Sequence, residues 1–261
     1  MNRKLILSYL LITFGISYFL WGVVLVLTGL CGMKLESPFC ITLYLLGSFG
    51  PAFGSYIAQK KVNRIAGFKE FIKKSFRFKS SVFSYLLVVL FLLLYFIFPF
   101  FAGQITLGIP VYIALLLVPL MLFGGGMEEV GWRWVLQPEL EKKLPFALSA
   151  VITSIIWALW HGPLFFIQGS SQSQVEFIPF YLLLVGMSVA QAALFEFSKN
   201  VWLSILLHCS FNAFQMAFVF EEKLSTSIIV SLIMIAGTML IRLFIKKSAY
   251  ATKTNAEEQH S

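Results

Sequence analysis

The chain has 261 residues, of which 59% are hydrophobic and only 12% are charged. Soluble domains carry roughly 25% charged residues, so this composition excludes an ordinary soluble enzyme and is typical of a protein that lies largely within a membrane. The formal net charge is +8, and the basic residues gather in short loops beside apolar runs. We attribute this charge to a solvated face that contacts lipid headgroups, and we expect no nucleic acid as a partner.

Eight apolar runs follow one another along the chain. Each can form a membrane span, which needs about 20 apolar residues to cross a hydrocarbon core of ~30 Å. The runs cover residues 5–30, 38–58, 82–103, 110–137, 145–168, 176–197, 200–219 and 224–245. The first run is too long for the apolar part of a cleaved signal peptide, so we expect it to be retained. The sequence predicts an all-α polytopic membrane protein with about eight transmembrane helices, a single transmembrane domain over 1–245 and a polar cytoplasmic tail over 246–261.

Basic residues lie at every second boundary between the runs. The loop over residues 59–81 alone holds eight lysines and arginines, whereas the loops 104–109 and 169–175 carry no charge. Because cytoplasmic loops are enriched in lysine and arginine, this alternation predicts a multi-pass protein of the cell membrane with both termini in the cytoplasm. The three cysteines show no CxxC spacing, and we expect free thiols.

Three of the runs carry polar side chains that membrane spans usually avoid. A charged side chain near the middle of a bilayer costs a few kcal/mol on insertion scales, so such residues are rarely kept without a use. The polar residues of the fourth, fifth and seventh runs are Glu128, Glu129 and Arg133, then His161, then His208 and Asn212.

The spacing of these residues groups them on helix faces. Residues four apart lie on one face, which pairs Glu129 with Arg133 and places His208 beside Asn212. Glu128 lies ~100° round the helix from Glu129, so it is the carboxylate left free for chemistry. At 1.5 Å per residue, Glu128 and His208 each lie ~12–13 Å from the inner end of their spans. We therefore expect the polar groups at similar depth, in the cytoplasmic half of the bilayer.

These residue types suit the hydrolysis of a carbonyl compound. A glutamate and a histidine that face one water molecule can deprotonate it for attack on a carbonyl carbon. A second histidine and an asparagine amide can donate hydrogen bonds to the oxyanion that develops. Cys209 points ~100° away from its neighbour His208, so activated water fits better than a cysteine nucleophile. Carboxylate and imidazole groups also bind zinc, and the sequence alone does not place a metal.

Three short motifs resemble a known family. EEVGWR, residues 128–133, matches the EExxxR motif of the CPBP intramembrane proteases, which include type II CAAX prenyl proteases and the Abi bacteriocin-processing or immunity proteins. The second motif of that family, FxxxH, looks like the stretch from Trp157 to His161, with tryptophan in place of phenylalanine. The third, HxxxN or HxxxD, looks like the stretch from His208 to Asn212. The resemblance covers roughly residues 110–220.

The resemblance implies an eight-helix intramembrane endopeptidase whose cavity opens to the cytosol. It implies that Glu128 and His161 activate the water, that Glu129 and Arg133 support them, and that the third motif serves the oxyanion. The family is often described as metalloproteases. A divalent metal such as zinc held by Glu128, His161 and His208 is therefore one alternative, and catalysis without a cofactor is the other.

The expected substrate is a peptide or membrane protein, processed as a CAAX-type tail or during bacteriocin maturation or self-immunity. Two other classes of function stay open. One is a proton-coupled transporter in which the glutamates and histidines form a relay, although the sequence has no inverted repeat. The other is a non-catalytic membrane protein for binding or immunity.

Overall fold

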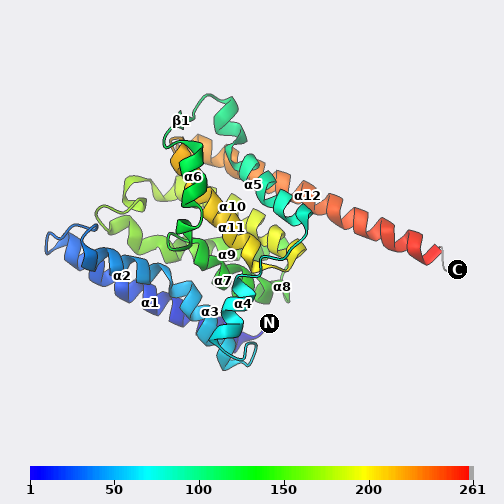
Figure 1. Cartoon of the computed structure of the whole chain (residues 1–261), viewed down its shortest axis with the longest axis horizontal. Helices are drawn as coiled ribbons and strands as arrows, with labels where there is room; N and C mark the ends of the chain where they lie inside the picture. The colour runs from blue at the N-terminus through cyan, green and yellow to red at the C-terminus, as the bar shows by residue number, and fades with distance from the viewer. Residues whose placement is uncertain (259–261) are drawn as a thin grey trace.

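The computed structural model describes residues 1–258, with side chains described as far as Lys247. Most of this range is helical (Figure 1). Strands occur in it only as β1 (Thr106–Leu107) and β2 (Phe218–Val219), which pair antiparallel. The predicted all-α class is confirmed.

Five helical segments are long and apolar enough to cross a membrane. These are α1 (Arg3–Gly29), α5 (Val82–Phe101), Phe146–Phe166, α10 (Phe177–Ser198) and Leu224–Lys247. The third consists of α9 (Phe146–His161) and η4 (Gly162–Phe166), and the last belongs to α12 (Leu224–Glu258). α2 (Pro38–Ser48) and α3 (Gly50–Lys61) meet at a bend of 43° and form a sixth span if they are taken together. α11 (Val201–Ala217) is apolar but shorter.

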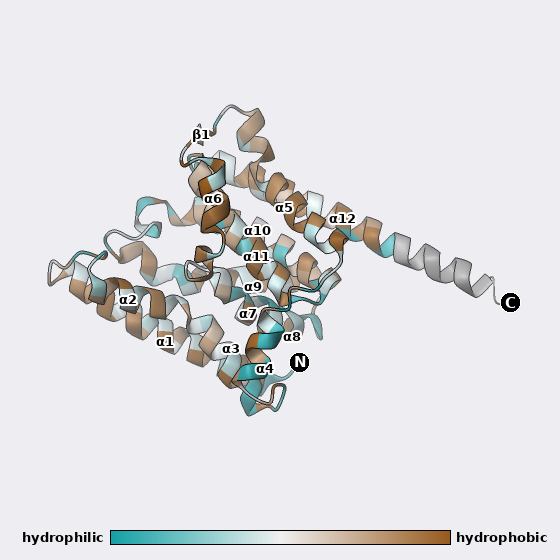
Figure 2. Cartoon of the chain, viewed as in Figure 1, coloured by the Kyte–Doolittle hydropathy of each residue, from teal (hydrophilic) through white to brown (hydrophobic). Residues whose placement is uncertain are grey.

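The outer surface of the helices suits contact with lipid. Large apolar side chains such as Leu11, Phe19 and Leu93 are more than half exposed. Figure 2 shows hydrophobic residues along the helices and hydrophilic residues gathered around α4 (Phe68–Ser75) and α8 (Gln137–Glu141). An apolar surface of this extent is unstable in water, so the prediction of a multi-pass membrane protein is confirmed.

The fourth apolar run differs from expectation, because residues 110–137 do not form one continuous helix. The chain breaks at Gly125, whose φ of +130° lies outside helical geometry. Beyond it the chain passes through a 3-10 turn, a short α-helical turn and a π-helical turn. The pieces are α6 (Val111–Leu117), η1 (Leu120–Leu122), η2 (Gly126–Glu128), α7 (Glu129–Gly131) and η3 (Trp132–Leu136). The placement of Glu128 on a regular helix is therefore wrong.

The end of the chain is largely helical, and the polar cytoplasmic tail over 246–261 stays a prediction. α12 continues as a helix to Glu258, so the predicted tail begins inside a helix rather than after one. Residues 259–261, the last part of that predicted tail, lie outside the described residues.

The helices have two ends of different composition. At one end Asn200 Nδ2 donates to the Arg77 carbonyl oxygen over 2.8 Å, which joins the 59–81 loop to the start of α11. At the other end β1 pairs with β2, and the loop 30–37 approaches Gly169 through Leu35. We call these the basic end and the opposite end.

α3 packs closely on α1 and positions the broken segment. A Cβ added at Gly54 would collide with the Thr13 side chain and lie 2.9 Å from the Tyr9 carbonyl oxygen, so only a residue without a side chain fits there. Small residues at such crossings allow two helix backbones to approach within a membrane. At the next residue, Ser55 Oγ donates to the Val130 carbonyl oxygen over 2.7 Å. α1, α3 and α7 are thereby fixed to one another.

Glu139 on α8 joins three segments at the basic end. Its side chain is fully buried, and it accepts hydrogen bonds from the Asn2 backbone N–H over 2.6 Å and from Lys142 Nζ over 2.5 Å. Arg64 forms a further ion pair with it. Burial alone would raise the pKa of the Glu139 carboxyl, but the hydrogen bonds from these donors outweigh burial and lower its pKa to about 2.

The lowered pKa predicts how acid affects stability. The folded state favours the ionised Glu139 carboxylate. This carboxylate therefore stabilises the fold above the usual carboxyl pKa of 4.5, and the stabilisation is lost as pH falls toward about 2. We expect Glu139→Gln to lower the melting temperature at neutral pH and to flatten its decline between about pH 4.5 and 2.

Thermal unfolding of the detergent-solubilised protein across this pH range checks the prediction. Glu221→Gln is the control, because the Glu221 side chain is 74% exposed and pairs with Lys223 at the surface, where ion pairs contribute little. Identical pH profiles for Glu139→Gln and the wild-type protein would contradict the prediction.

Candidate active site

A cavity of about 540 Å³ lies between α2, α9, α10 and α11. Four of the six residues singled out in the sequence line it: Glu128, His161, His208 and Asn212. The other two, Glu129 and Arg133, are fully buried. The broken fourth run, α9 and α11 thus bring the three sequence motifs together around one cavity.

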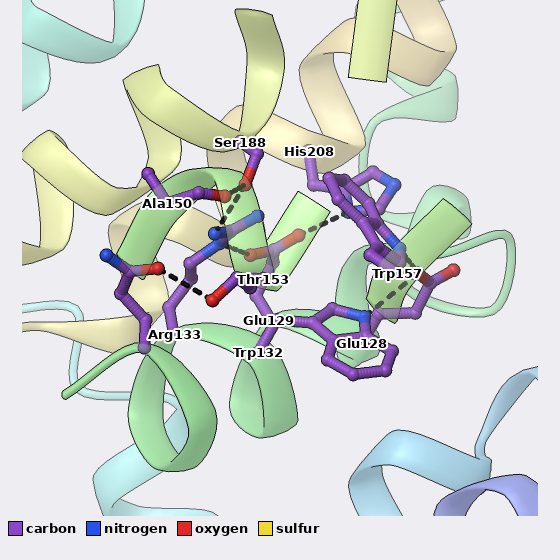
Figure 3. Close-up of polar contacts among 10 residues, drawn as sticks. Glu128, Glu129, Trp132, Arg133, Ala150, Thr153, Trp157, Ser188 and His208 are labelled. Carbon is purple, nitrogen blue, oxygen red and sulfur yellow. Dashed lines mark hydrogen bonds and ion pairs between the residues drawn. The ribbon is translucent and has the colours of Figure 1, made fainter. Parts of the chain in front are cut away.

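Glu129 is the central acceptor of a buried charge network. Its Oε2 accepts from Arg133 Nε over 2.9 Å, and its Oε1 accepts from His208 Nδ1 over 2.8 Å. Figure 3 shows Glu129 between these two side chains. Because a carboxylate oxygen accepts at Nδ1, this nitrogen of His208 carries a proton and its Nε2 is directed elsewhere. The i,i+4 pair expected from the sequence forms despite the irregular helix.

Arg133 extends the network to two further helices. Its Nη1 donates to Ser188 Oγ of α10 over 3.0 Å, and Ser188 Oγ donates to the Ala150 carbonyl oxygen of α9 over 3.2 Å. The guanidinium carbon lies 5.3 Å from the centre of the Trp157 ring, a cation–π distance. The contact of Ser188 with Arg133 could not be predicted, because Ser188 is one small residue among many in an apolar helix.

Glu128 points away from Glu129 and toward two indoles (Figure 3). Its Oε2 accepts from Trp157 Nε1 over 2.6 Å and, at the limit of a hydrogen bond, from Trp132 Nε1 over 3.5 Å. The expected difference in direction between the two glutamates therefore occurs, although through a break in the helix. In the sequence, Trp157 stands out only as a replacement for phenylalanine, and the role of its N–H donor is not signalled.

Three polar atoms converge on the space beside Gly125. A Cβ built there would lie 2.7 Å from His208 Nε2, 3.0 Å from Asn212 Nδ2 and 3.2 Å from Glu128 Oε1. Asn212 Nδ2 also donates to the Gly124 carbonyl oxygen over 2.7 Å, which fixes the amide. A carboxylate oxygen, an imidazole nitrogen and an amide nitrogen therefore lie close together against the Gly125 backbone, and all three side chains line the cavity.

His161 lies on the α9 side of the cavity and is oriented by its own helix. Its Nδ1 is 2.9 Å from the Trp157 carbonyl oxygen, which can only accept, so Nδ1 carries the proton and Nε2 has the lone pair. Its ring packs edge-on against Trp160 and Phe180. Trp157 thus contacts Glu128 through its indole and His161 through its backbone.

Comparison with known proteins agrees with this arrangement. Residues 109–214 match the profile of the family described as type II CAAX prenyl endopeptidase Rce1-like. The chain is also 26% identical over 240 residues to CAAX prenyl protease 2 of Methanococcus maripaludis, a similarity that covers 81% of this chain and 83% of that protein. The matched segment contains all six site residues. This segment is similar to the type II CAAX protease family.

The side chains of the candidate site do not fit a metal centre. Among the described residues, no group of three or more His, Cys, Asp or Glu side chains is placed to hold a metal ion. Glu129 is committed to Arg133 and His208, and one oxygen of Glu128 is committed to an indole. The proposed zinc set of Glu128, His161 and His208 has no support in this geometry, so we derive no step through a metal.

The cavity does not open at the end of the helices that the sequence predicts to be cytoplasmic. Its lining includes Ser171, Gln172, Val175 and Glu222, which belong to loops at the opposite end, and no residue of the 59–81 loop. The sequence predicts that the basic end is cytoplasmic, whereas the family resemblance implies a cavity open to the cytosol. These two expectations exclude each other, because the cavity opens at the end away from the basic loops.

The buried network predicts the effect of removing one charge. Glu129→Gln leaves Arg133 without its carboxylate partner in a fully buried site, and breaking such a pair costs about 3–5 kcal/mol. Thermal unfolding in detergent measures this loss. The double variant Glu129→Gln with Arg133→Gln is expected to regain part of it, because no charge is then left unpaired. A single variant as stable as the wild-type protein would show that Glu129 is not needed to balance Arg133.

Proposed function

We propose that the protein is an intramembrane endopeptidase in which Glu128 activates a water molecule for attack on a peptide carbonyl. The observation that carries this proposal is that Glu128 Oε1, His208 Nε2 and Asn212 Nδ2 lie close together against Gly125, with all three side chains in the wall of one cavity. The similarity to type II CAAX prenyl endopeptidases supports it, since all six site residues lie in the matched segment.

Charge balance assigns the protons of the resting site. Glu128 and Glu129 as carboxylates contribute two negative charges, and Arg133 with a protonated His208 contributes two positive charges. A buried group of charges is most stable when it is paired and neutral overall. In this state Glu128 accepts protons, and both ring nitrogens of His208 donate, with Nδ1 bound to Glu129 and Nε2 facing the cavity.

The reaction then proceeds in two steps. Glu128 Oε1 takes a proton from water as the water oxygen bonds to the substrate carbonyl carbon, while the Nε2 lone pair of His161 orients the same water. The oxyanion that forms accepts hydrogen bonds from His208 Nε2 and Asn212 Nδ2. As the intermediate collapses, the carbon–nitrogen bond breaks and Glu128 transfers its proton to the leaving amine. Glu128 ends as a carboxylate, ready for another cycle.

Two classes of substrate are consistent with this chemistry. The similarity to CAAX prenyl protease 2 supports a CAAX-type tail. The proposed chemistry acts on the peptide bond and requires no prenyl group, so bacteriocin maturation or self-immunity is equally compatible with the site. In both cases the scissile bond enters a cavity lined mainly by aromatic and aliphatic side chains, with the polar atoms at its inner end.

Replacement of the proposed base tests the function directly. Glu128→Gln keeps the shape of the side chain but cannot accept the proton, so cleavage of an unbiased peptide library is expected to fall by roughly 10²–10⁴-fold. Melting behaviour should be retained, because His208 releases one proton when the Glu128 charge is removed and the buried site stays neutral overall. Glu70→Gln, a change outside the cavity, should cleave normally. Full activity of Glu128→Gln would mean that hydrolysis occurs elsewhere or not at all.

Crowding these three side chains gives a second test. In Gly125→Ala the new methyl group would press against Glu128, His208 and Asn212 and shift them, so cleavage should fall by roughly 10²-fold or more. The positive φ also adds strain of about 1–3 kcal/mol, so folding is measured alongside. Gly124→Ala is the matched control, because its methyl group would lie at an ordinary 3.4 Å from Met121 Sδ. Equal losses in the two variants would contradict the role assigned to these three side chains.

A further inference from the structure

Each helix that lines the cavity contributes residues only from the half that lies farther from the basic end. α11 starts at the basic end and contributes His208 and later residues, up to Met216. α10 runs the other way, and its lining residues stop at Met187, halfway along the helix. The lining is completed by Ser171 and Glu222 from loops of the opposite end. The mouth therefore lies at the opposite end.

Buried polar contacts close off the cavity from the basic end of the helices. Arg133 is fully buried beneath the inner end of the cavity. Thr153 Oγ1 donates to Gln137 Oε1 over 2.8 Å, and both side chains are at most 1% exposed. Below them lies the fully buried Glu139 with its three donors. A substrate cannot reach Glu128 from this end without breaking these contacts.

The charges of the loops assign a side of the membrane to each end. The 59–81 loop holds eight lysines and arginines, and Lys142, Lys143 and Lys199 lie at the same end. The loops of the opposite end, residues 30–37, 102–110, 167–176 and 218–223, hold only two lysines. The positive-inside rule therefore places the basic end in the cytoplasm.

We propose that the active-site cavity opens on the non-cytoplasmic face, so that its substrate is a peptide segment that has already crossed or been exposed outside the membrane. The assignment of a substrate rests on the proposed function, whereas the direction of the mouth does not depend on catalysis. The lining includes the carboxylates Glu128 and Glu222 and no lysine or arginine. A segment that is neutral or cationic fits this lining, whereas an acidic one meets like charge.

Cysteine labelling tests the direction of the mouth without any activity assay. Cys31 is a native, exposed thiol in the loop 30–37, whereas Cys40 and Cys209 are buried. We expect a membrane-impermeant maleimide to label Cys31 of the wild-type protein in intact cells. In a Cys31→Ser background, Ser171→Cys at the mouth should also be labelled, and Lys79→Cys at the basic end only after the cells are permeabilised.

Each cysteine is first shown to react in detergent, so that a lack of label in cells reports the side of the membrane. Label on Lys79→Cys in intact cells, with Cys31 and Ser171→Cys protected, would overturn the proposal, and so would label on both ends. If Ser171→Cys does not fold, Cys31 of the unmodified protein gives the same answer.

Cleavage by sealed vesicles tests the side from which substrate enters. Quenched-fluorescence peptides with lysine flanks, added outside, should be cleaved by right-side-out vesicles and by inside-out vesicles only after detergent is added. Matched peptides with glutamate flanks should be cleaved more slowly. Cleavage by intact inside-out vesicles alone would overturn the proposed side. No cleavage even in detergent would count against the endopeptidase function, while the labelling result would still decide the direction of the mouth.

Discussion

Arg133 carries a fully buried positive charge inside a membrane protein, and the arrangement of the site follows from the need to compensate it. An uncompensated buried charge is unstable, so a carboxylate and further acceptors must be held against it. Glu129 supplies the carboxylate, and Ser188 adds an acceptor from α10. Because the second oxygen of Glu129 holds His208 Nδ1, the same contact also fixes the imidazole that faces the cavity. Compensation of one charge thereby sets the position of a proposed catalytic group.

The break in the fourth apolar run separates the tasks of the two adjacent glutamates. On a regular helix they would diverge by ~100° and differ little in environment. Here Glu128 ends the 3-10 turn η2, and Glu129 begins α7. Gly125 brings the chain close to α11, where any side chain would meet His208 and Asn212. The irregular backbone is tolerated because it lines a cavity inside the protein rather than facing lipid.

Much of the fold, and the residues that gather at the cavity, could be predicted from the sequence. Span positions follow from apolar length, and the i,i+4 spacing of Glu129 and Arg133 predicted the pair that forms. The break at Gly125 could not be predicted, because three glycines weaken a helix without specifying the geometry that replaces it. The hydrogen bond from Trp157 to Glu128 joins residues 29 apart in the sequence. It depends on how α9 packs, which no local pattern encodes. The direction of the mouth likewise depends on the packing of whole helices.

The closed basic end also bears on the transporter alternative. A secondary transporter needs a site that opens to each side in turn, usually by movement of one repeat against another. In this protein the buried contacts of Arg133, Gln137 and Glu139 bind η3 and α8 to α9, α10 and the N-terminal segment. Opening that end would expose or unpair several buried polar groups at once, each at a cost of about 1–3 kcal/mol. A cavity that opens at one end only suits hydrolysis, in which substrate enters and products leave by the same mouth and no ion must cross.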